Sequence, residues 1–538
     1  MTRQSSGAAL LLETLSRHGV DKIFLVSGTD YPAFTEENLR GVGPDLFLVP
    51  HEITAVSAAI GYSLGGKLGV AAVHTLPGTA NSIGSIMNAY GSRVPLLLIA
   101  GRTPYTEAGS AASRNGRIHW TQETRDQGEM IRQWTKWDFE VRRCEQVPIA
   151  ISRAIQIAKS EPCGPVYFVL PREVSIEKSK NQTLRAAPFE PGPSPEAVTQ
   201  SRKLINESKN PLIITWRAGR RESWFNALSN FADHANIPVL NYAGEQLNYP
   251  ASGKMAVDSF DLPRSDLVIV AECDVPWIPK SAQLGPDAKV IKVDCDPAHQ
   301  YIPYYGFPSD VSAVSCIDHF FNALIRDVVP KDDSQVLKLR NEQIECKRRE
   351  INHLKKSKRI HPRYLSYQIG KLGMPVVNEY RFDPKYANFN SFGSYFSSLA
   401  TGYIGWALGA SVGLKMSTRK DFVAAVGDGS FIFGVPDAFY YIAHDYPVMV
   451  AIFDNGGWLS SSKAALDVFP EGVAAAKKRF PGTEFKRYEI GATVKAYGGY
   501  FELIEKPDQV ASALQRGKTE LKKRKKISVL QFIVERIL

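Results

Sequence analysis

The sequence predicts an α/β protein built from three doubly wound parallel-sheet domains, and three observations support this fold class. The chain has 538 residues, which suggests three to four domains at about 150 residues each. Its composition, 44% hydrophobic and 22% charged, is that of a globular protein. Short continuous apolar runs alternate with helix-length segments, as expected for strands buried on both faces of parallel sheets.

The first domain is predicted at residues 1–178. Residues 55–65 carry small and apolar side chains at helical spacing, between runs of strand character. The N-terminal segment has a short apolar stretch that Glu13 interrupts, which favours an amphipathic helix over a signal peptide. The expected strands are at 23–26, 46–49, 70–75, 95–100 and 166–170.

A second and a third domain are predicted at 195–335 and 360–538. The segment 173–200 is rich in proline, lysine and small residues, as an interdomain linker would be. A highly charged helical segment, 336–359, precedes the third domain, in which apolar runs and helical patterns alternate again. The first expected strand of this domain is at 374–378. The expected strands of the second domain are at 211–215, 237–241, 266–271 and 289–294.

Charge and cysteine content limit the partners and the compartment. The formal net charge of +10 is compatible with nucleic acid, an acidic membrane surface or small anions. The basic run 522–526 has no interleaved aromatic residues and no nucleic-acid motif beside it, so we expect a solvated surface and no nucleic-acid partner. No apolar run reaches eighteen residues, so no membrane span is expected. Six scattered cysteines without a C-x-x-C pair favour reduced thiols and a cytoplasmic protein.

The most informative segment is 423–458. One apolar strand runs directly into a glycine-rich turn that contains Asp428, and the next ends just before Asn455. Neighbouring parallel strands deliver both side chains to one edge of a sheet, where carboxylate and amide oxygens suit magnesium or calcium. The glycines and the helix start after Ser430 suit a phosphate. The segment therefore predicts a magnesium-diphosphate site; a tight turn with Asp428 as a helix cap is the alternative.

This segment resembles the thiamine-diphosphate-binding motif, which runs from GDG over about thirty residues to NN. The resemblance implies that Asp428, the side chain of Asn455 and the main-chain oxygen of Gly457 bind magnesium. Asp454 stands where the family usually has the first asparagine. The resemblance also implies that the turn Gly427, Asp428, Gly429 and Ser430 contacts the cofactor.

Residues 50–65, which begin Pro-His-Glu, resemble the H-E-x-x-A-x-x-x-A-x-G-Y segment of the acetolactate synthase and benzoylformate decarboxylase group. The resemblance implies that Glu52 hydrogen-bonds the aminopyrimidine ring of the cofactor. A carboxyl group that shares its proton with a ring nitrogen favours the imino tautomer, which can deprotonate the thiazolium carbon. Taken alone, Glu52 would be an acidic residue at a helix start.

Two shorter segments resemble cofactor-contacting stretches of the same group. Residues 75–81 resemble T-x-G-P-G-x-x-N, which implies that Pro77, Gly78 and Asn81 cover the cofactor, although Leu76 replaces the first glycine. Residues 402–406 resemble G-x-M-G-F. This implies that Gly402 lies at the cofactor and that Ile404 is the wedge that keeps it bent, with core packing as the alternative for Ile404.

The sequence indicates the residues that would contact the substrate less clearly than those that would contact the cofactor. His74 resembles the histidine of the benzoylformate decarboxylase segment L-H-S-A-A-G-T-G-N, which implies a proton donor and acceptor; a half-buried histidine at a strand end is the alternative. Residues 119–127 resemble the Q-E-x-D stretch of the group. Counting back from Asp126 places Glu123 where the active-site glutamine usually falls, and we expect Gln122 to take that role with a one-residue insertion.

Two arginines and the central domain leave further alternatives. Arg114 and Arg117 either hold a substrate carboxylate or belong to a solvated loop. The segment 216–221, WRAGRR, follows a strand where an anion could bind. FAD, an ADP group or no nucleotide in the central domain all stay open at this point.

The resemblance implies a thiamine-diphosphate- and magnesium-dependent lyase or carboligase that acts on a 2-oxo acid, with decarboxylation through an enamine intermediate. The alternatives are a 2-hydroxyacyl-CoA lyase and, from another class, a non-catalytic relative that binds the cofactor. The resemblance also implies a homodimer at least, with a tetramer common, in which Glu52 of one chain meets Asp428 of the other.

Overall fold

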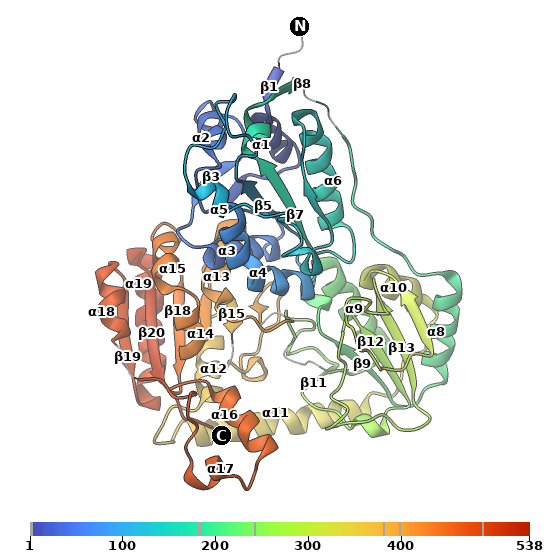
Figure 1. Ribbon diagram of the computed structural model, residues 1–538. Coiled ribbons are helices and arrows are strands. Elements are labelled where there is room, and N and C mark those ends of the chain that lie inside the picture. Colours follow the sequence, from blue (N-terminus) through green and yellow to red (C-terminus); the bar gives the residue numbers. More distant parts are fainter. Residues whose placement is uncertain are drawn as a thin grey trace.

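The computed structural model describes residues 4–180, 182, 184–240, 244–379, 382–397, 400–486 and 489–537. In this part of the chain, three six-stranded sheets form the cores of three α/β domains, and a two-stranded sheet lies near the N-terminus (Figure 1). The described strand pairs of the three large sheets are parallel, whereas the small sheet is antiparallel. This arrangement confirms the predicted fold class.

The first sheet has the order β3-β2-β4-β5-β7-β6. All residues of β4 and β7 are buried, which explains their continuous apolar runs. Helices α1 (Gly7–Arg17) and α6 (Val147–Lys159) pack against each other, and their apolar side chains share one core cluster. The five strands predicted in this domain are confirmed. The strands are β2 (Lys22–Leu25), β3 (Asp45–Leu48), β4 (Gly69–Val73), β5 (Leu96–Arg102), β6 (Asp138–Glu140) and β7 (Pro165–Pro171).

The third sheet repeats this topology, with the order β16-β15-β17-β18-β20-β19. In both sheets the strand that comes first in the chain pairs with the one that comes third: β2 with β4, and β15 with β17. The connections therefore diverge between these two strands. Such switch points are where α/β sheets bind ligands, at the carboxyl ends of the strands. The strands are β15 (Val376–Glu379), β16 (Tyr395–Phe396), β17 (Val423–Gly427), β18 (Met449–Asp454), β19 (Tyr500–Ile504) and β20 (Ser528–Ile533).

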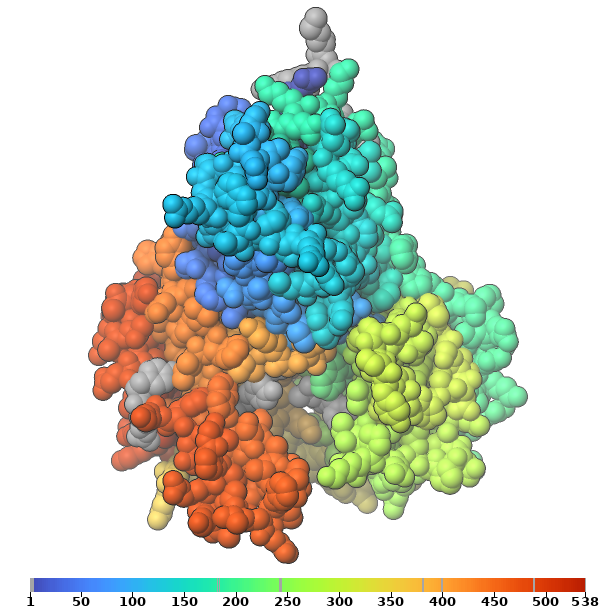
Figure 2. Space-filling model, in the orientation of Figure 1, coloured from blue at the N-terminus to red at the C-terminus, as the bar shows by residue number. Residues whose placement is uncertain are grey.

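The central sheet has a different order, β11-β10-β9-β12-β13-β14, with its switch point between β9 and β12. Helix α11 (Ser334–Leu354) leads from this domain to the third and matches the predicted charged segment. Figure 2 shows the first domain lying across the other two. The strands are β9 (Pro211–Thr215), β10 (Val239–Leu240), β11 (Ala256–Val257), β12 (Leu267–Ala271), β13 (Lys289–Asp294) and β14 (Val311–Val314).

The first and third domains are joined by two closely packed helices, α3 (Glu52–Leu64) and α13 (Trp406–Thr418). A Cβ on Gly413 would lie 1.9 Å from the carbonyl oxygen of Ala58, and one on Gly61 would lie 2.1 Å from that of Ala410. These glycines let the two backbones approach closely, and both helices contribute to one hydrophobic core. The position of α3 relative to α13 is therefore set by backbone contact.

Some local features differ from the sequence-based expectation. The segment 173–200 is not all linker, because it contains α7 (Arg172–Ile176), β8 (Lys178–Lys180) and the start of α8 (Pro195–Glu207). Strand β8 pairs with β1 (Gln4–Ser6), a contact between distant segments that periodicity does not reveal. The domain boundaries at 178, 195, 335 and 360 remain predictions and lie outside the large sheets. Among the described helices, none is long and apolar enough to cross a membrane.

Candidate active site

A pocket of about 200 Å³ opens at the carboxyl edge of the third sheet. Asp428 is the first residue of α14 (Asp428–Phe433), directly after β17, and Asn455 follows β18. Since β17 and β18 are paired neighbours, the predicted convergence of the two side chains is observed. The pocket is lined by Ile404, Gly427, Asp428, Gly429, Ser430, Asn455, Gly457, Trp458, Leu459, Ser460 and Ser461. Gly402 does not line this pocket and lies exposed just before Ile404.

Two oxygen-bearing side chains, Asp428 and Asn455, are buried at this pocket. Asp428 is only 5% exposed, and burial together with the nearby carboxylate of Asp454 raises its pKa to about 7. The Oδ1 atom of Asn455 is buried and has no hydrogen-bond partner among the described residues. A buried carboxylate and an orphaned amide oxygen at one sheet edge fit a hard divalent cation such as magnesium.

Asp454, which replaces the usual asparagine, is used differently. Its Oδ1 atom accepts the backbone N–H of Gly456 (3.0 Å), and its Oδ2 atom accepts from Nε2 of Gln531 (2.7 Å). These bonds hold the turn after β18. Gly457 is required at its position, because its φ is +147° and a Cβ there would lie 2.0 Å from the carbonyl oxygen of Thr483.

Glu379 is a site residue that the sequence interpretation missed. It ends β15, is 1% exposed, and accepts the backbone N–H groups of Gly405 and Ala407, the latter at 2.9 Å. Burial raises its pKa to about 7, and the Ser430 hydroxyl also hydrogen-bonds to it. Glu379 thus fixes the start of α13 behind the pocket. The available signal was a carboxylate directly after a predicted strand next to a switch point.

Ile404 lies in the loop before α13 and is half-buried where it lines the pocket. Gly405 follows it with a φ of +90°, and a Cβ there would lie 2.9 Å from the Cα of Gly434. A side chain that borders a cavity is not simply a core residue. The geometry therefore favours the expected wedge position over core packing, although the wedge role itself remains a prediction.

A second group of predicted residues meets on the first domain. Glu52 is the first residue of α3, and His51 caps this helix by accepting the N–H of Ile53 at Nδ1 (3.2 Å). Nδ2 of Asn81 donates to Oε2 of Glu52 (3.2 Å). A Cβ on Gly78 would lie 3.3 Å from Oε1 of Glu52. The structure thus brings Glu52, Gly78 and Asn81 together.

The segment 75–81 is the start of helix α4 (Thr75–Gly91) and not an irregular loop. Thr75 has a φ of +42°, which is strained for a β-branched residue. Leu76, in place of glycine, takes part in the first turn, and Pro77 is exposed on that turn. His74 precedes the helix, and its Nδ1 atom lies 2.7 Å from Oδ1 of buried Asp30.

The structure separates the roles of Gln122 and Glu123. The carboxylate of Glu123 accepts from Arg102 (2.8 Å), Thr103 (2.8 Å) and Arg114 (3.1 Å), so it is held in an ion-pair network. The Oε1 atom of Gln122 is buried without a hydrogen-bond partner among the described residues. The arrangement favours Gln122 as the available polar group.

The two arginines of this loop also differ. Arg114 is engaged by Glu123 and by the carbonyl oxygen of Pro104, to which its Nε donates (2.6 Å). Arg117 is exposed. Arg114 is therefore committed to the loop structure, and the choice between a solvated role and substrate binding stays open for Arg117.

The switch point of the central sheet is occupied by ion pairs of the chain itself. Arg217, after β9, donates to both carboxylate oxygens of Asp274, after β12, one of them at 2.8 Å. Arg220 donates to Oε2 of Glu161 (2.9 Å). The guanidinium groups of the segment 216–221 thus already have carboxylate partners, where an FAD or ADP phosphate would need them free.

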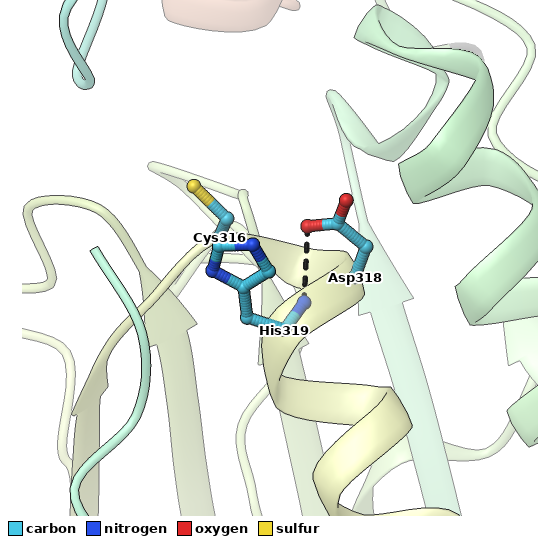
Figure 3. A group of neighbouring side chains, drawn as sticks. All are labelled: Cys316, Asp318 and His319. Atoms are coloured by element: carbon cyan, nitrogen blue, oxygen red, sulfur yellow. Dashed lines mark hydrogen bonds between the residues drawn. The ribbon is translucent and has the colours of Figure 1, made fainter. Parts of the chain in front are cut away.

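Cys316, Asp318 and His319 form a group whose potential metal-binding atoms lie within 4.8 Å of one another (Figure 3). Asp318 accepts the backbone N–H of His319 (3.0 Å), and Nδ1 of His319 lies 3.1 Å from the carbonyl oxygen of Pro191. The Sγ atoms of Cys316 and Cys295 are 3.8 Å apart. These contacts give each of the three residues a partner within the protein. The group is therefore explained by packing at the start of α10 (Ile317–Leu324).

Comparison with known families agrees with the fold. Residues 5–130 match the N-terminal TPP binding domain of thiamine pyrophosphate enzymes, and residues 382–532 match the C-terminal TPP binding domain. The two matches together span more than half of the chain. The chain therefore belongs to the thiamine pyrophosphate enzyme family.

Individual relatives are distant but cover nearly the whole chain. The acetolactate synthase of Bacillus subtilis is 21% identical over 551 residues, which cover 96% of this chain and 91% of that protein. The sulfoacetaldehyde acetyltransferase of Castellaniella defragrans is 22% identical and covers 98% and 92%. The crystal structure of benzoylformate decarboxylase from Polynucleobacter necessarius superposes with a TM-score of 0.80 at 22% identity, with 99% of each chain covered.

Proposed function

We propose that this protein is a thiamine-diphosphate- and magnesium-dependent enzyme that cleaves or forms a carbon–carbon bond next to the carbonyl of a 2-oxo acid. The pocket at the carboxyl edge of the third sheet is the observation that carries this proposal, because the Asp428 carboxylate and the orphaned Asn455 oxygen there need a cation. When bound, thiamine diphosphate would supply a carbon nucleophile and an electron sink.

The third domain would hold the diphosphate end. Asp428, the Asn455 side chain and the Gly457 carbonyl are the proposed magnesium ligands. The turn from Gly427 to Ser430 lines the pocket and would contact the diphosphate. Gly429 is required in this turn, because a Cβ there would lie 2.4 Å from the Trp458 ring. Ile404 would hold the cofactor in its bent conformation from the wall of the pocket.

The first domain would hold the pyrimidine end. Glu52, hydrogen-bonded to Asn81, would share its proton with a ring nitrogen of the cofactor, and Gly78 leaves room beside the carboxylate. Pro77 lies on the same helical turn. His74 and Gln122 are the proposed groups that bind or protonate the substrate.

The two halves of the site suggest a dimer. The described residues that line the third-domain pocket all lie between 404 and 461, so Glu52 does not border it within one chain. We therefore infer that Glu52 of one subunit faces Asp428 of a second copy, in a homodimer that could pair further into a tetramer. Small molecules, a 2-oxo acid or an acyl-CoA thioester, are the proposed substrates.

The experiment that tests this function identifies covalent adducts on the cofactor. The protein is incubated with thiamine diphosphate, magnesium and a panel of 2-oxo acids and 2-hydroxyacyl-CoA thioesters, quenched with acid, and analysed by NMR. Adducts with 2-oxo acids support the proposal, and adducts with the thioesters alone would indicate a 2-hydroxyacyl-CoA lyase. Cofactor binding without any adduct would contradict catalysis and favour a non-catalytic relative.

A variant pair makes the test specific for the site. Glu52→Gln is expected to retain cofactor affinity within a few-fold but to lower turnover by at least a hundredfold, because the carboxyl proton is no longer exchangeable with the ring. Glu207→Gln, an exposed residue on α8, is the matched control with unchanged activity. Near-wild-type turnover of Glu52→Gln would overturn the assignment.

A further inference from the structure

The switch point of the first sheet contains a buried acid paired with a histidine. Asp30 follows β2 and His74 follows β4, and these two strands are neighbours although the residues are 44 positions apart. Nδ1 of His74 lies 2.7 Å from Oδ1 of Asp30, and the N–H of Thr75 donates to Oδ2 of Asp30 (3.3 Å). Both oxygens of the carboxylate are therefore directed at the His74 segment.

Two glycines, Gly28 and Gly101, leave space for this pair. A Cβ on Gly28 would lie 2.1 Å from Nδ1 of His74, and one on Gly101 would lie 1.7 Å from Oδ2 of Asp30. The Asp30 side chain is 2% exposed, whereas that of His74 is 24% exposed. The acid is thus sealed behind the histidine, and the imidazole is the part of the pair that a ligand can reach.

Besides Asp30, two titratable residues from other segments, Glu52 and His119, lie near His74. Glu52, at the start of α3, lies close enough to add to the Asp30 effect; the hydrogen bond with Asp30 is the main reason that the pKa of His74 is raised. His119, on α5 (Ile118–Thr121), is buried, and burial followed by Arg172 and Arg114 lowers its pKa. The carboxylates of Asp30 and Glu52 thus favour the protonated form of His74, whereas the surroundings of His119 favour its neutral form.

The Nε2 atom of His74 points away from Asp30 in the ring and has no hydrogen-bond partner among the described residues. A histidine whose Nδ1–H is fixed by a carboxylate presents its other nitrogen in one defined protonation state and orientation. Asp30 acts here through His74, because its own carboxylate has almost no exposed surface.

Resting on the proposed function, we propose that Asp30 is a positioning residue that keeps His74 oriented and protonated as the proton donor to a substrate oxygen. The Nε2–H bond of the imidazolium breaks, the proton forms an O–H bond on the substrate, and neutral imidazole keeps its Nδ1–H bond to Asp30. Asp30 neither gains nor loses a proton in this step, and solvent returns the proton to Nε2.

The test compares the holoenzyme with its Asp30→Asn variant, which retains an oxygen acceptor for Nδ1–H but removes the charge. The His74 titration is followed by NMR with ¹³C-labelled histidine, assigned with His74→Gln. The pKa of His74 should be lower in the variant, because burial is then no longer offset by a carboxylate. Asp45→Asn, at an exposed acid of the same domain, is the control and should leave the titration unchanged.

The second readout is the pH profile of kcat/KM on the substrate found by the adduct screen. The proton-donating form is lost as pH rises through the pKa of His74, so the alkaline limb should move to lower pH in Asp30→Asn. At a pH above the alkaline limb of the variant, kcat/KM of Asp30→Asn should be about tenfold to a hundredfold lower than that of the wild type. Its cofactor affinity should be unchanged. His74→Gln should abolish the limb.

The outcomes of these experiments distinguish failure of the Asp30 proposal from failure of the proposed enzyme function. An unchanged His74 titration, or an unchanged alkaline limb in an active Asp30→Asn enzyme, would overturn this inference and leave the proposed function standing. A wild-type holoenzyme that forms no adduct with any substrate would overturn the proposed function, and the proton-donor role of His74 with it.

Discussion

Asn88 on α4 holds both backbone groups of Tyr403, 315 residues away in the sequence. Its Nδ2 donates to the Tyr403 carbonyl (2.7 Å), and its Oδ1 accepts the Tyr403 N–H (3.1 Å) and the Thr401 hydroxyl (2.6 Å). The fully buried Asn88 thus ties the loop before Ile404 to the first domain. The wall of the third-domain pocket depends on a side chain from another domain.

Replacing Asn88 with alanine should loosen this loop. Two backbone groups of Tyr403 lose their partner, which costs about 1–3 kcal/mol for each group left buried and unsatisfied. We expect a lower Tm and faster hydrogen exchange at residues 402–406, together with weaker cofactor binding. Asn341→Ala, on the exposed face of α11, is the control. Unchanged exchange in that segment would contradict the anchoring role.

Asp428 and Asp454 should respond differently to loss of charge. Asp428→Asn removes the carboxylate that we assign to the cation, so magnesium-dependent cofactor affinity measured by calorimetry should fall at least a hundredfold. The apo protein should be as stable as the wild type or more stable, because a buried carboxylate next to that of Asp454 is removed. Asp454→Asn should weaken cofactor binding much less, since that side chain is bonded to Gln531 and Gly456. Equal losses in both variants would contradict the ligand assignment.

The close contact of α3 and α13 predicts a strong effect at Gly413. In Gly413→Ala the new Cβ would lie 1.9 Å from the Ala58 carbonyl oxygen, so a helix must shift. Overpacking of this kind costs about 1–3 kcal/mol, and the Tm should fall by several degrees. Gly306→Ala is the control, because no atom lies within 4 Å of its Cβ position. Equal Tm values for the two variants would contradict a rigid contact.

Glu245 should make stability depend on pH. This residue is fully buried beside Arg217, the Ser92 hydroxyl donates to it (3.0 Å), and burial raises its pKa to about 7 from an ordinary 4.5. The folded protein then binds the proton more tightly than the unfolded chain. Its contribution to the free energy of unfolding is fully present below pH 4.5. About 3 kcal/mol of it is lost as the pH rises to about 7.

Glu245→Gln keeps an acceptor for Ser92 but does not titrate. Its Tm should therefore change less than that of the wild type between pH 5 and pH 8. Glu196→Gln, at the exposed start of α8, serves as the control and should follow the wild-type curve. A Glu245→Gln curve parallel to the wild type would show that this carboxyl group does not carry the pH dependence.

The agreement between sequence and structure is best where the evidence is local. The convergence of Asp428 and Asn455 was predictable, because each follows a strand directly and carboxyl ends of parallel strands share an edge. Glu379 follows a predicted strand in the same way, but its bond to Gly405 spans 26 residues and depends on where α13 begins. Local patterns carry no information on that contact.

The sequence by itself determined the fold class and the family, since apolar periodicity and the glycine-rich turns are read within a few residues of one another. Only the tertiary structure decided which polar groups are already paired: Glu123 with Arg102, Arg217 with Asp274, and His74 with Asp30. The physical reason is strand order. Periodicity shows that a strand is buried, but the neighbour of that strand, and so the partner of the side chain at its end, is set by how the sheet is assembled.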